Sequence, residues 1–112
     1  MLQSDSNSQD RRSQRRAPLD VLANRFLDGY PYLCRATDIS TRGIRLRRFN
    51  EPSANSRYVG LQFQLPGSEE ILTASGEVVS SDEGSQAVGI RFTHLSPKTR
   101  AAIERYLSPR KS

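Results

Sequence analysis

The feature that most constrains this chain is a set of short apolar runs with a period of two, each ended by turn residues. The clearest run places Val59, Leu61, Phe63 and Leu65 at alternate positions and stops at a Pro-Gly pair. Because successive side chains of a β-strand point to opposite faces, this alternation predicts a strand with one buried face. Runs of the same kind predict six strands, over residues 19–26, 30–37, 44–48, 59–65, 71–79 and 88–92.

Turn signals between the runs indicate how the strands connect. Asp28-Gly29 separates the first two runs, and residues 82–84 separate the last two. Asp28-Gly29 is a strong hairpin signal, which favours antiparallel neighbours, and residues 82–84 form a turn sequence. Gly76 interrupts the fifth run, where it indicates a β-bulge or a close backbone approach. Since closure removes exposed strand edges, we predict a mainly β fold, a six-stranded antiparallel β-barrel.

The pattern changes to helical spacing after residue 95. Ser96 can cap a helix, and Pro97 suits its first position. We therefore predict one amphipathic C-terminal α-helix over residues 96–108. Its apolar residues are Ala102, Ile103, Tyr106 and Leu107.

At the other end of the chain, residues 1–16 carry no apolar side chain after Leu2. Such a segment cannot bury enough surface to offset its chain entropy, so we expect a flexible basic N-terminal arm. The predicted organisation is a single domain, with the arm over residues 1–16, the barrel over residues 17–95 and the helix over residues 96–108.

Composition narrows the classes of function. The single cysteine, Cys34, and the single histidine, His94, exclude an internal disulfide and the usual zinc sites, and we expect ordinary packing for both. The sequence contains no run of about 20 apolar residues and no signal peptide, so we expect a cytoplasmic protein without membrane insertion. Asp20 and Asp38 are the acidic residues near the basic segments, and no nucleophile or paired base accompanies them. Enzymatic activity, a metal ion and a cofactor are therefore not expected.

The charge of the chain favours an anionic partner. The net charge is +5 at pH 7, and 15 of the 17 basic residues are arginines. A guanidinium grips phosphate or the O6/N7 edge of guanine with two hydrogen bonds, whereas lysine acts as a point charge. The bias toward arginine therefore favours shaped recognition of a nucleotide or a nucleic acid, although a GC-rich genome would also enrich arginine.

Two short motifs stand out against this scaffold. The arm contains R-x-x-x-R twice, as Arg11/Arg15 and as Arg12/Arg16. Residues 38–43, in the turn between the second and third predicted strands, match D-x-S-x-x-G. Taken singly, the first motif is explained by a solvated basic tail, and the second by a turn whose side chains satisfy backbone groups.

Together the two motifs resemble the PilZ domain, a family of bacterial receptors for the second messenger cyclic di-GMP. The resemblance covers nearly the whole chain, because the strand order, the G-I-R-F sequence at 89–92 and the closing helix also follow the order of the family. It implies a cyclic di-GMP receptor that is not an enzyme. In this family the second arginine shortly precedes the first strand, so the resemblance assigns Arg12 and Arg16, with Arg11 directly before the motif.

The chemistry of this ligand fits the matched residues. Cyclic di-GMP presents two phosphodiesters and two guanines, so a receptor needs cationic forks for phosphate and O6/N7, and an acceptor for the guanine N–H donors. Arg12 and Arg16 supply the forks, and Asp38 supplies the acceptor. Ser40 offers a hydroxyl. Gly43 would let the turn adopt unusual dihedral angles and let the ligand approach the backbone closely.

The residue before R-x-x-x-R bears on the stoichiometry. In the family it influences whether one ligand or a stacked pair binds, and an arginine there favours the pair. Arg11 therefore implies two cyclic di-GMP molecules per chain, because it adds positive charge near four phosphodiesters. If Arg11/Arg15 were the working motif, Asp10 would precede it and would disfavour the pair.

Three functions are compatible with the sequence. As a receptor, we expect the protein to change the conformation of its arm and to signal, as an adaptor, to a separate and unidentified partner protein. The alternative is a small basic β-barrel that binds RNA or DNA, although no aromatic stacking platform accompanies its basic residues. The third is a PilZ-like interaction module without a ligand. The nucleic-acid alternative uses the arm and a strip of arginines, Arg35, Arg42, Arg45, Arg47 and Arg48.

Overall fold

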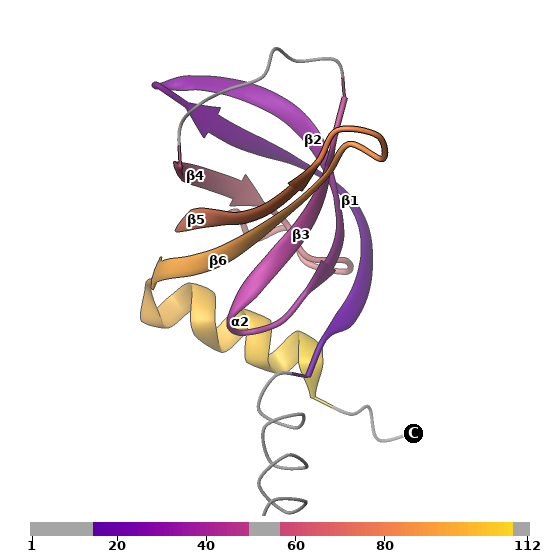
Figure 1. Ribbon diagram of the computed structural model, residues 1–112. Coiled ribbons are helices and arrows are strands. Elements are labelled where there is room, and N and C mark those ends of the chain that lie inside the picture. The colour runs from indigo at the N-terminus through magenta and orange to yellow at the C-terminus, as the bar shows by residue number, and fades with distance from the viewer. Residues whose placement is uncertain (1–14, 50–56, 109–112) are drawn as a thin grey trace, which may run out of the picture.

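The computed structural model describes residues 15–49 and 57–108. Its elements are β1 (Ala17–Leu27), β2 (Tyr30–Ile39), β3 (Gly43–Arg48), β4 (Tyr58–Phe63), β5 (Leu72–Asp82), β6 (Ala87–Leu95) and α2 (Pro97–Leu107). The six strands pair antiparallel in the closed order β1-β2-β3-β6-β5-β4, and α2 lies across one end of the barrel (Figure 1). The predicted six-stranded barrel with one C-terminal helix is confirmed. The division into arm, barrel and helix stays a prediction, since residues 1–14 lie outside the described part.

The first hairpin follows from its turn residues. Asp28 and Gly29 have φ angles of 52° and 84°, the left-handed conformations that a two-residue turn of this kind requires at both positions. The turn sets the β1–β2 register, in which Leu27 lies opposite Tyr30 and Ala23 opposite Cys34. β1 then pairs with β4 on its other side, and this pairing closes the barrel.

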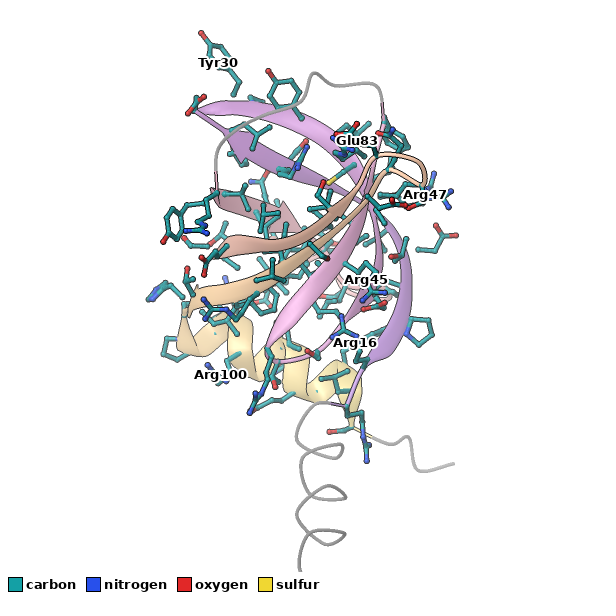
Figure 2. The ribbon with its side chains drawn as sticks, viewed as in Figure 1. Arg16, Tyr30, Arg45, Arg47, Glu83 and Arg100 are labelled. Atoms are coloured by element: carbon teal, nitrogen blue, oxygen red, sulfur yellow. The ribbon has the colours of Figure 1, made fainter. Side chains whose placement is uncertain are left out.

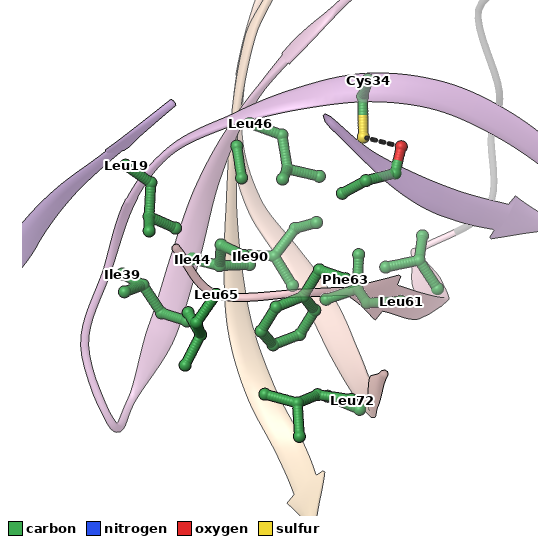
Figure 3. Close-up of a cluster of buried hydrophobic side chains, with 14 of the residues drawn as sticks. Leu19, Cys34, Ile39, Ile44, Leu46, Leu61, Phe63, Leu65, Leu72 and Ile90 are labelled. Carbon is green, nitrogen blue, oxygen red and sulfur yellow. Dashed lines mark hydrogen bonds between the residues drawn. The ribbon is translucent and has the colours of Figure 1, made fainter. Parts of the chain in front are cut away.

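The barrel interior is filled by the alternating apolar residues that the sequence pattern selects (Figure 3). Leu46, Leu61, Phe63 and Ile90 are each 2% exposed or less. Cys34 is fully buried with its Sγ 3.5 Å from the carbonyl oxygen of Ala23, and burial raises the pKa of the Cys34 thiol to about 11. The expectation of ordinary packing is therefore confirmed for Cys34.

β4 is shorter than the sequence pattern predicts. Pairing of β4 with β1 and with β5 ends at Phe63, whereas the predicted strand continues to Leu65. Leu65 is nevertheless buried, at 5% exposure. The alternation continues past the last strand pair because the residues that follow still pack onto the core. The period of two in the sequence therefore indicates which side chains are buried, whereas hydrogen-bonded strand pairing ends two residues earlier.

Gly76 lies in β5, at a point where the strand packs tightly against β6. The register of this pair shifts between Ser75, opposite His94, and Gly76, opposite Phe92, so the extra residue lies on β6. Of the two alternatives predicted for Gly76, the close backbone approach is the one observed. A Cβ atom at Gly76 would overlap the Ile90 side chain and would lie 2.9 Å from the carbonyl oxygen of Arg91. Glycine is thus required here by the neighbouring strand.

Arg48 corrects one prediction from the sequence. It was assigned to the basic strip on the surface, but it is only 7% exposed. The reason is the period of two, which places Arg48 on the same inner face as Ile44 and Leu46. Arg25 is also buried, at 5% exposure, and burial is the main cause of its lowered pKa. The surface strip therefore lacks one of its five predicted arginines.

The helix begins as its sequence predicts. The Ser96 Oγ accepts a hydrogen bond of 3.1 Å from the backbone N–H of Thr99, and Pro97 occupies the first turn. The buried hydroxyl of Thr99 donates to the carbonyl oxygen of Thr73 in β5, at 3.1 Å. Near the other end of α2, the Tyr106 hydroxyl donates to the carbonyl oxygen of Pro18 in β1, at 2.9 Å. These contacts fix the helix across the barrel end.

Removal of the helix cap should destabilise the protein measurably. We expect Ser96→Ala to lower the free energy of unfolding by about 1 kcal/mol, because the Thr99 N–H loses its acceptor. Ser96→Asp keeps a capping oxygen and should retain most of the stability. Urea unfolding followed by circular dichroism measures both changes. Equal stability of Ser96→Ala and the original protein would contradict the capping role.

Candidate functional site

Asp38 lies near the end of β2, between two guanidinium groups. Arg16, just before β1, donates to Asp38 Oδ1 from Nε at 2.9 Å and also from Nη2. Arg45 lies opposite Asp38 in the β2–β3 register, and its Nε is 4.0 Å from Asp38 Oδ2. β2 is irregular between Ala36 and Asp38, so the period of two is interrupted just before the carboxylate. The fold thus joins the segment before β1 to the D-x-S-x-x-G turn through a single carboxylate.

The Arg16–Asp38 pair contributes little to stability. The Arg16 side chain is 43% exposed and that of Asp38 is 25% exposed. Ion pairs in this range of exposure contribute about 0–1 kcal/mol, because solvent screens the attraction and ordering long side chains costs entropy. These charges are therefore available to a ligand without a large loss of folding energy.

Ser40 shapes the turn that follows Asp38. Its Oγ accepts hydrogen bonds from the backbone N–H groups of Arg42, at 3.0 Å, and Gly43, at 3.2 Å. Its own N–H donates to the carbonyl oxygen of Gly43 at 2.9 Å, and the residue is fully buried. The serine of the motif is thus the acceptor that holds the turn together. Contact between its hydroxyl and a ligand stays a prediction.

Gly43 corrects the reason given for a glycine at this position. The left-handed glycines of the described chain are Gly29 and Gly67, so unusual dihedral angles at Gly43 are not observed. Instead, a Cβ atom at Gly43 would overlap the carbonyl oxygen of Ile90 in β6. The glycine is required because β3 and β6 approach closely at the start of their pairing.

An open groove of about 190 Å³ lies beside these residues, and we call it the basic groove. Arg16 and Arg45 project at the end of the barrel that α2 covers, far from Tyr30 at the opposite end (Figure 2). The neutral residues Val79, Ser80 and Gly89 come from β5 and β6. The lining residues are Arg16, Arg42, Gly43, Ile44, Arg45, Val79, Ser80, Gly89, Ile90 and Arg91.

Several of these lining residues were not selected as site residues from the sequence. Arg45 was assigned only to the nucleic-acid strip, and Arg91 only to the G-I-R-F sequence. The register places Gly89 opposite Arg45 and Arg91 opposite Gly43. The available signal was that Arg45 and Arg91 alternate with the buried Ile44 and Ile90, which marks them as outward residues. The pairing of β3 with β6 is what makes them neighbours.

The arginines of the arm are partly described. Arg11 and Arg12 lie outside the described residues. Arg15 and Arg16 point to different places: Arg15 Nη1 is 3.4 Å from the carbonyl oxygen of Leu107 at the end of α2, whereas Arg16 lines the basic groove. Of the two, only Arg16 is beside Asp38.

The described residues contain neither a metal-binding cluster nor a membrane-spanning helix. Among residues 15–49 and 57–108, no group of three or more histidine, cysteine, aspartate or glutamate side chains could hold a metal ion. Within the same residues, every helix is too short or too polar to cross a membrane.

In a comparison with known families, residues 9–108 match the PilZ domain. No curated protein matches the chain. The family match covers most of the sequence, including the arm arginines and the D-x-S-x-x-G turn.

Solved structures with the same fold include three bacterial proteins. The Bacillus subtilis inhibitor of motility MotI/DgrA is 17% identical, with a TM-score of 0.71 over 87% of this chain and 49% of its own. The PilZ domain of Escherichia coli YcgR, determined with c-di-GMP, is 15% identical, with a TM-score of 0.66 over 87% and 88%. The Borreliella burgdorferi PlzA protein, in complex with c-di-GMP, is 17% identical, with a TM-score of 0.65 over 96% and 45%. The chain thus spans about half the length of MotI/DgrA and PlzA.

Proposed function

Because the chain belongs to the PilZ domain family, we propose that it is a receptor for cyclic di-GMP and that the basic groove is the binding site. The observation that carries the proposal is the position of Asp38 between Arg16 and Arg45, two arginines that line this groove. The PilZ domain of YcgR and the PlzA protein were each solved with this ligand, which supports the choice.

The geometry supplies the complementary chemistry. Asp38 accepts hydrogen bonds from the N1–H and N2 amino group of one guanine. Arg16, released from part of its contact with Asp38, grips a phosphate or an O6/N7 edge, with Arg12 as its counterpart in the arm. Arg45, together with Arg42 and Arg91, adds positive charge to the groove. Ser40 and Gly43 hold the turn so that the Asp38 carboxylate faces the ligand.

Of the two possible R-x-x-x-R pairs, Arg12/Arg16 has more support than Arg11/Arg15. Arg16 contacts Asp38, whereas Arg15 lies against the end of α2. We therefore keep Arg12 and Arg16 as the paired arginines, with Arg11 directly before them.

We propose that the arm transmits the signal to a partner protein. Arg16 connects the arm to the site, so ligand binding at Arg12 and Arg16 would order the preceding residues and change the surface offered to a separate partner protein. In this role the protein is a receptor and adaptor without catalysis, metal ion or cofactor. Its cytoplasmic location stays a prediction.

The nucleic-acid alternative loses support from the structure. Arg48 is buried, and Arg35 is held by Asp20 at 2.6 Å. The surface strip is thus reduced to arginines that mostly line the basic groove. We therefore keep RNA as a control ligand rather than a second proposal.

Calorimetric titration of the whole chain tests the receptor proposal. We expect cyclic di-GMP to bind in the micromolar range or tighter, while GTP and a short RNA bind far more weakly. Folded protein that releases no heat with high micromolar cyclic di-GMP would overturn the proposal.

The stoichiometry is tested with the same titration. We expect two cyclic di-GMP molecules per chain, because Arg11 offsets repulsion among the four phosphodiesters of a stacked pair. Arg11→Leu should shift the ratio toward one, whereas Arg15→Ala should leave it at two. A ratio of one in the original protein would contradict the stacked pair. Loss of binding in Arg15→Ala would instead show that the Arg11/Arg15 register is used.

A further inference from the structure

A second hollow also borders the D-x-S-x-x-G turn, at Thr41 and Arg42. Its volume is about 500 Å³, larger than that of the basic groove. Arg42 belongs to the turn, and residues 91–95 form the C-terminal half of β6. Arg100 belongs to α2 and is labelled in Figure 2. Its polar lining consists of Thr41, Arg42, Arg91, Thr93, His94 and Arg100.

The charge of the second hollow is positive and incompletely balanced. No acidic residue of the described chain lines it. Arg91 forms an ion pair with Glu77, which also lies 3.4 Å from Arg57. Within residues 15–49 and 57–108, Arg42 and Arg100 have no carboxylate within ion-pair distance. Three guanidinium groups thus surround a polar space, and one neighbouring carboxylate is already shared between Arg91 and Arg57.

The side chains around this space are suited to phosphate oxygens. Guanidinium groups form charge-assisted, often bidentate hydrogen bonds with phosphate, and threonine hydroxyls and an imidazole N–H are further donors. Small-molecule sites commonly have volumes of about 300–1,000 Å³, which is more than a single inorganic phosphate fills. The half-buried ring of Phe92 adds an apolar wall beside the polar groups.

From this arrangement we propose that the second hollow binds the di- or triphosphate group of a nucleotide. The site is distinct from the basic groove, because Thr93, His94 and Arg100 line only the second hollow. Arg42 and Arg91 line both, so the two sites are neighbours along one surface. This inference goes beyond cyclic di-GMP recognition and does not depend on it.

The experiment is an NMR titration of the whole chain with inorganic pyrophosphate and, separately, with ATP. We expect both probes to shift the backbone amide signals of Thr93, His94 and Arg100. Arg100→Gln should weaken the binding of each about tenfold, through loss of a charge-assisted hydrogen bond. Arg105→Gln is the matched control, because Arg105 is an exposed arginine on the same helix that does not line the second hollow. It should leave binding unchanged.

Three results would overturn the proposal. They are unshifted signals at the second hollow with millimolar probe, equal effects of Arg100→Gln and Arg105→Gln, or binding of pyrophosphate without binding of ATP. An Arg16→Ala variant separates this proposal from the receptor function. It should lose cyclic di-GMP binding and keep the pyrophosphate shifts at Thr93 and His94.

Discussion

Replacing Arg16 with alanine is expected to weaken cyclic di-GMP binding at least tenfold. Arg16 donates hydrogen bonds to Asp38 and lines the basic groove. Its loss removes a guanidinium group that would form bidentate hydrogen bonds with phosphate or guanine. Because one charge-assisted hydrogen bond contributes about 1.5–3 kcal/mol, the loss of binding should be at least tenfold. Calorimetric titration measures the change in dissociation constant. The melting temperature should shift little, since the Arg16–Asp38 pair is partly exposed and solvent screens its attraction.

The same titration should show a comparable loss for Asp38→Ala. This change removes the proposed acceptor for guanine and leaves Arg16 and Arg45 without the carboxylate between them. Asp38→Asn distinguishes the two effects, because an amide keeps one acceptor oxygen and loses the charge. We expect Asp38→Asn to bind less tightly than the original protein and no more weakly than Asp38→Ala.

Arg35→Ala is the matched control for both variants. Arg35 also forms an exposed arginine–aspartate pair, with Asp20, but it does not line the basic groove. Binding by this variant should equal that of the original protein. If Arg35→Ala weakened binding as much as Arg16→Ala, the effect would be one of overall charge, and the assigned site would be wrong.

Gly43→Ala is expected to lower the free energy of unfolding by about 2–3 kcal/mol. The added Cβ would overlap the carbonyl oxygen of Ile90. That oxygen belongs to the backbone of β6, which pairs with β3 at this point, so it cannot move aside as a flexible side chain could. Forcing atoms into a packed interior costs about 1–3 kcal/mol or more, and here the strand pairing is also strained. Chemical unfolding monitored by circular dichroism measures the difference.

Gly84→Ala is the control for this substitution. A Cβ at Gly84 would meet only Asp82 Oδ2, at 3.9 Å, which is ordinary contact. We expect its stability to be close to that of the original protein. If Gly43→Ala remained as stable as Gly84→Ala and yet lost cyclic di-GMP binding, the glycine would serve the ligand directly and the structural reason would be wrong.

Local chemistry in the sequence was sufficient to predict the strands, the helix and those of their ends that turn or capping residues mark. Asp28-Gly29 determines the first hairpin because both residues adopt left-handed conformations there. Ser96 and Pro97 determine the start of α2 because the cap contacts a backbone N–H only three residues away. The fold class could also be predicted, because closing six such strands into a barrel pairs the edge strands that an open sheet would leave exposed.

For the candidate site, the sequence was sufficient to find most of the residues, but it did not reveal all of their roles. Asp38, Ser40 and Gly43 lie within six residues, so their motif could be found from spacing, and Arg16 was found from its position before the first strand. Their detailed roles were not all predictable. The Ser40 hydroxyl holds the turn, and Gly43 makes room for β6, which lies about 50 residues later in the chain.

The sequence by itself therefore determined the strands, the helix and the motif residues, because periodicity, turn chemistry and capping act between residues that are close along the chain. Only the tertiary structure decided that β3 pairs with β6, and hence that Arg91, Val79 and Ser80 share a groove with Arg16 and Arg45. It also decided that Arg48 is inside the barrel. These outcomes depend on strand order and on the inner face of a closed sheet, which contacts between distant segments establish.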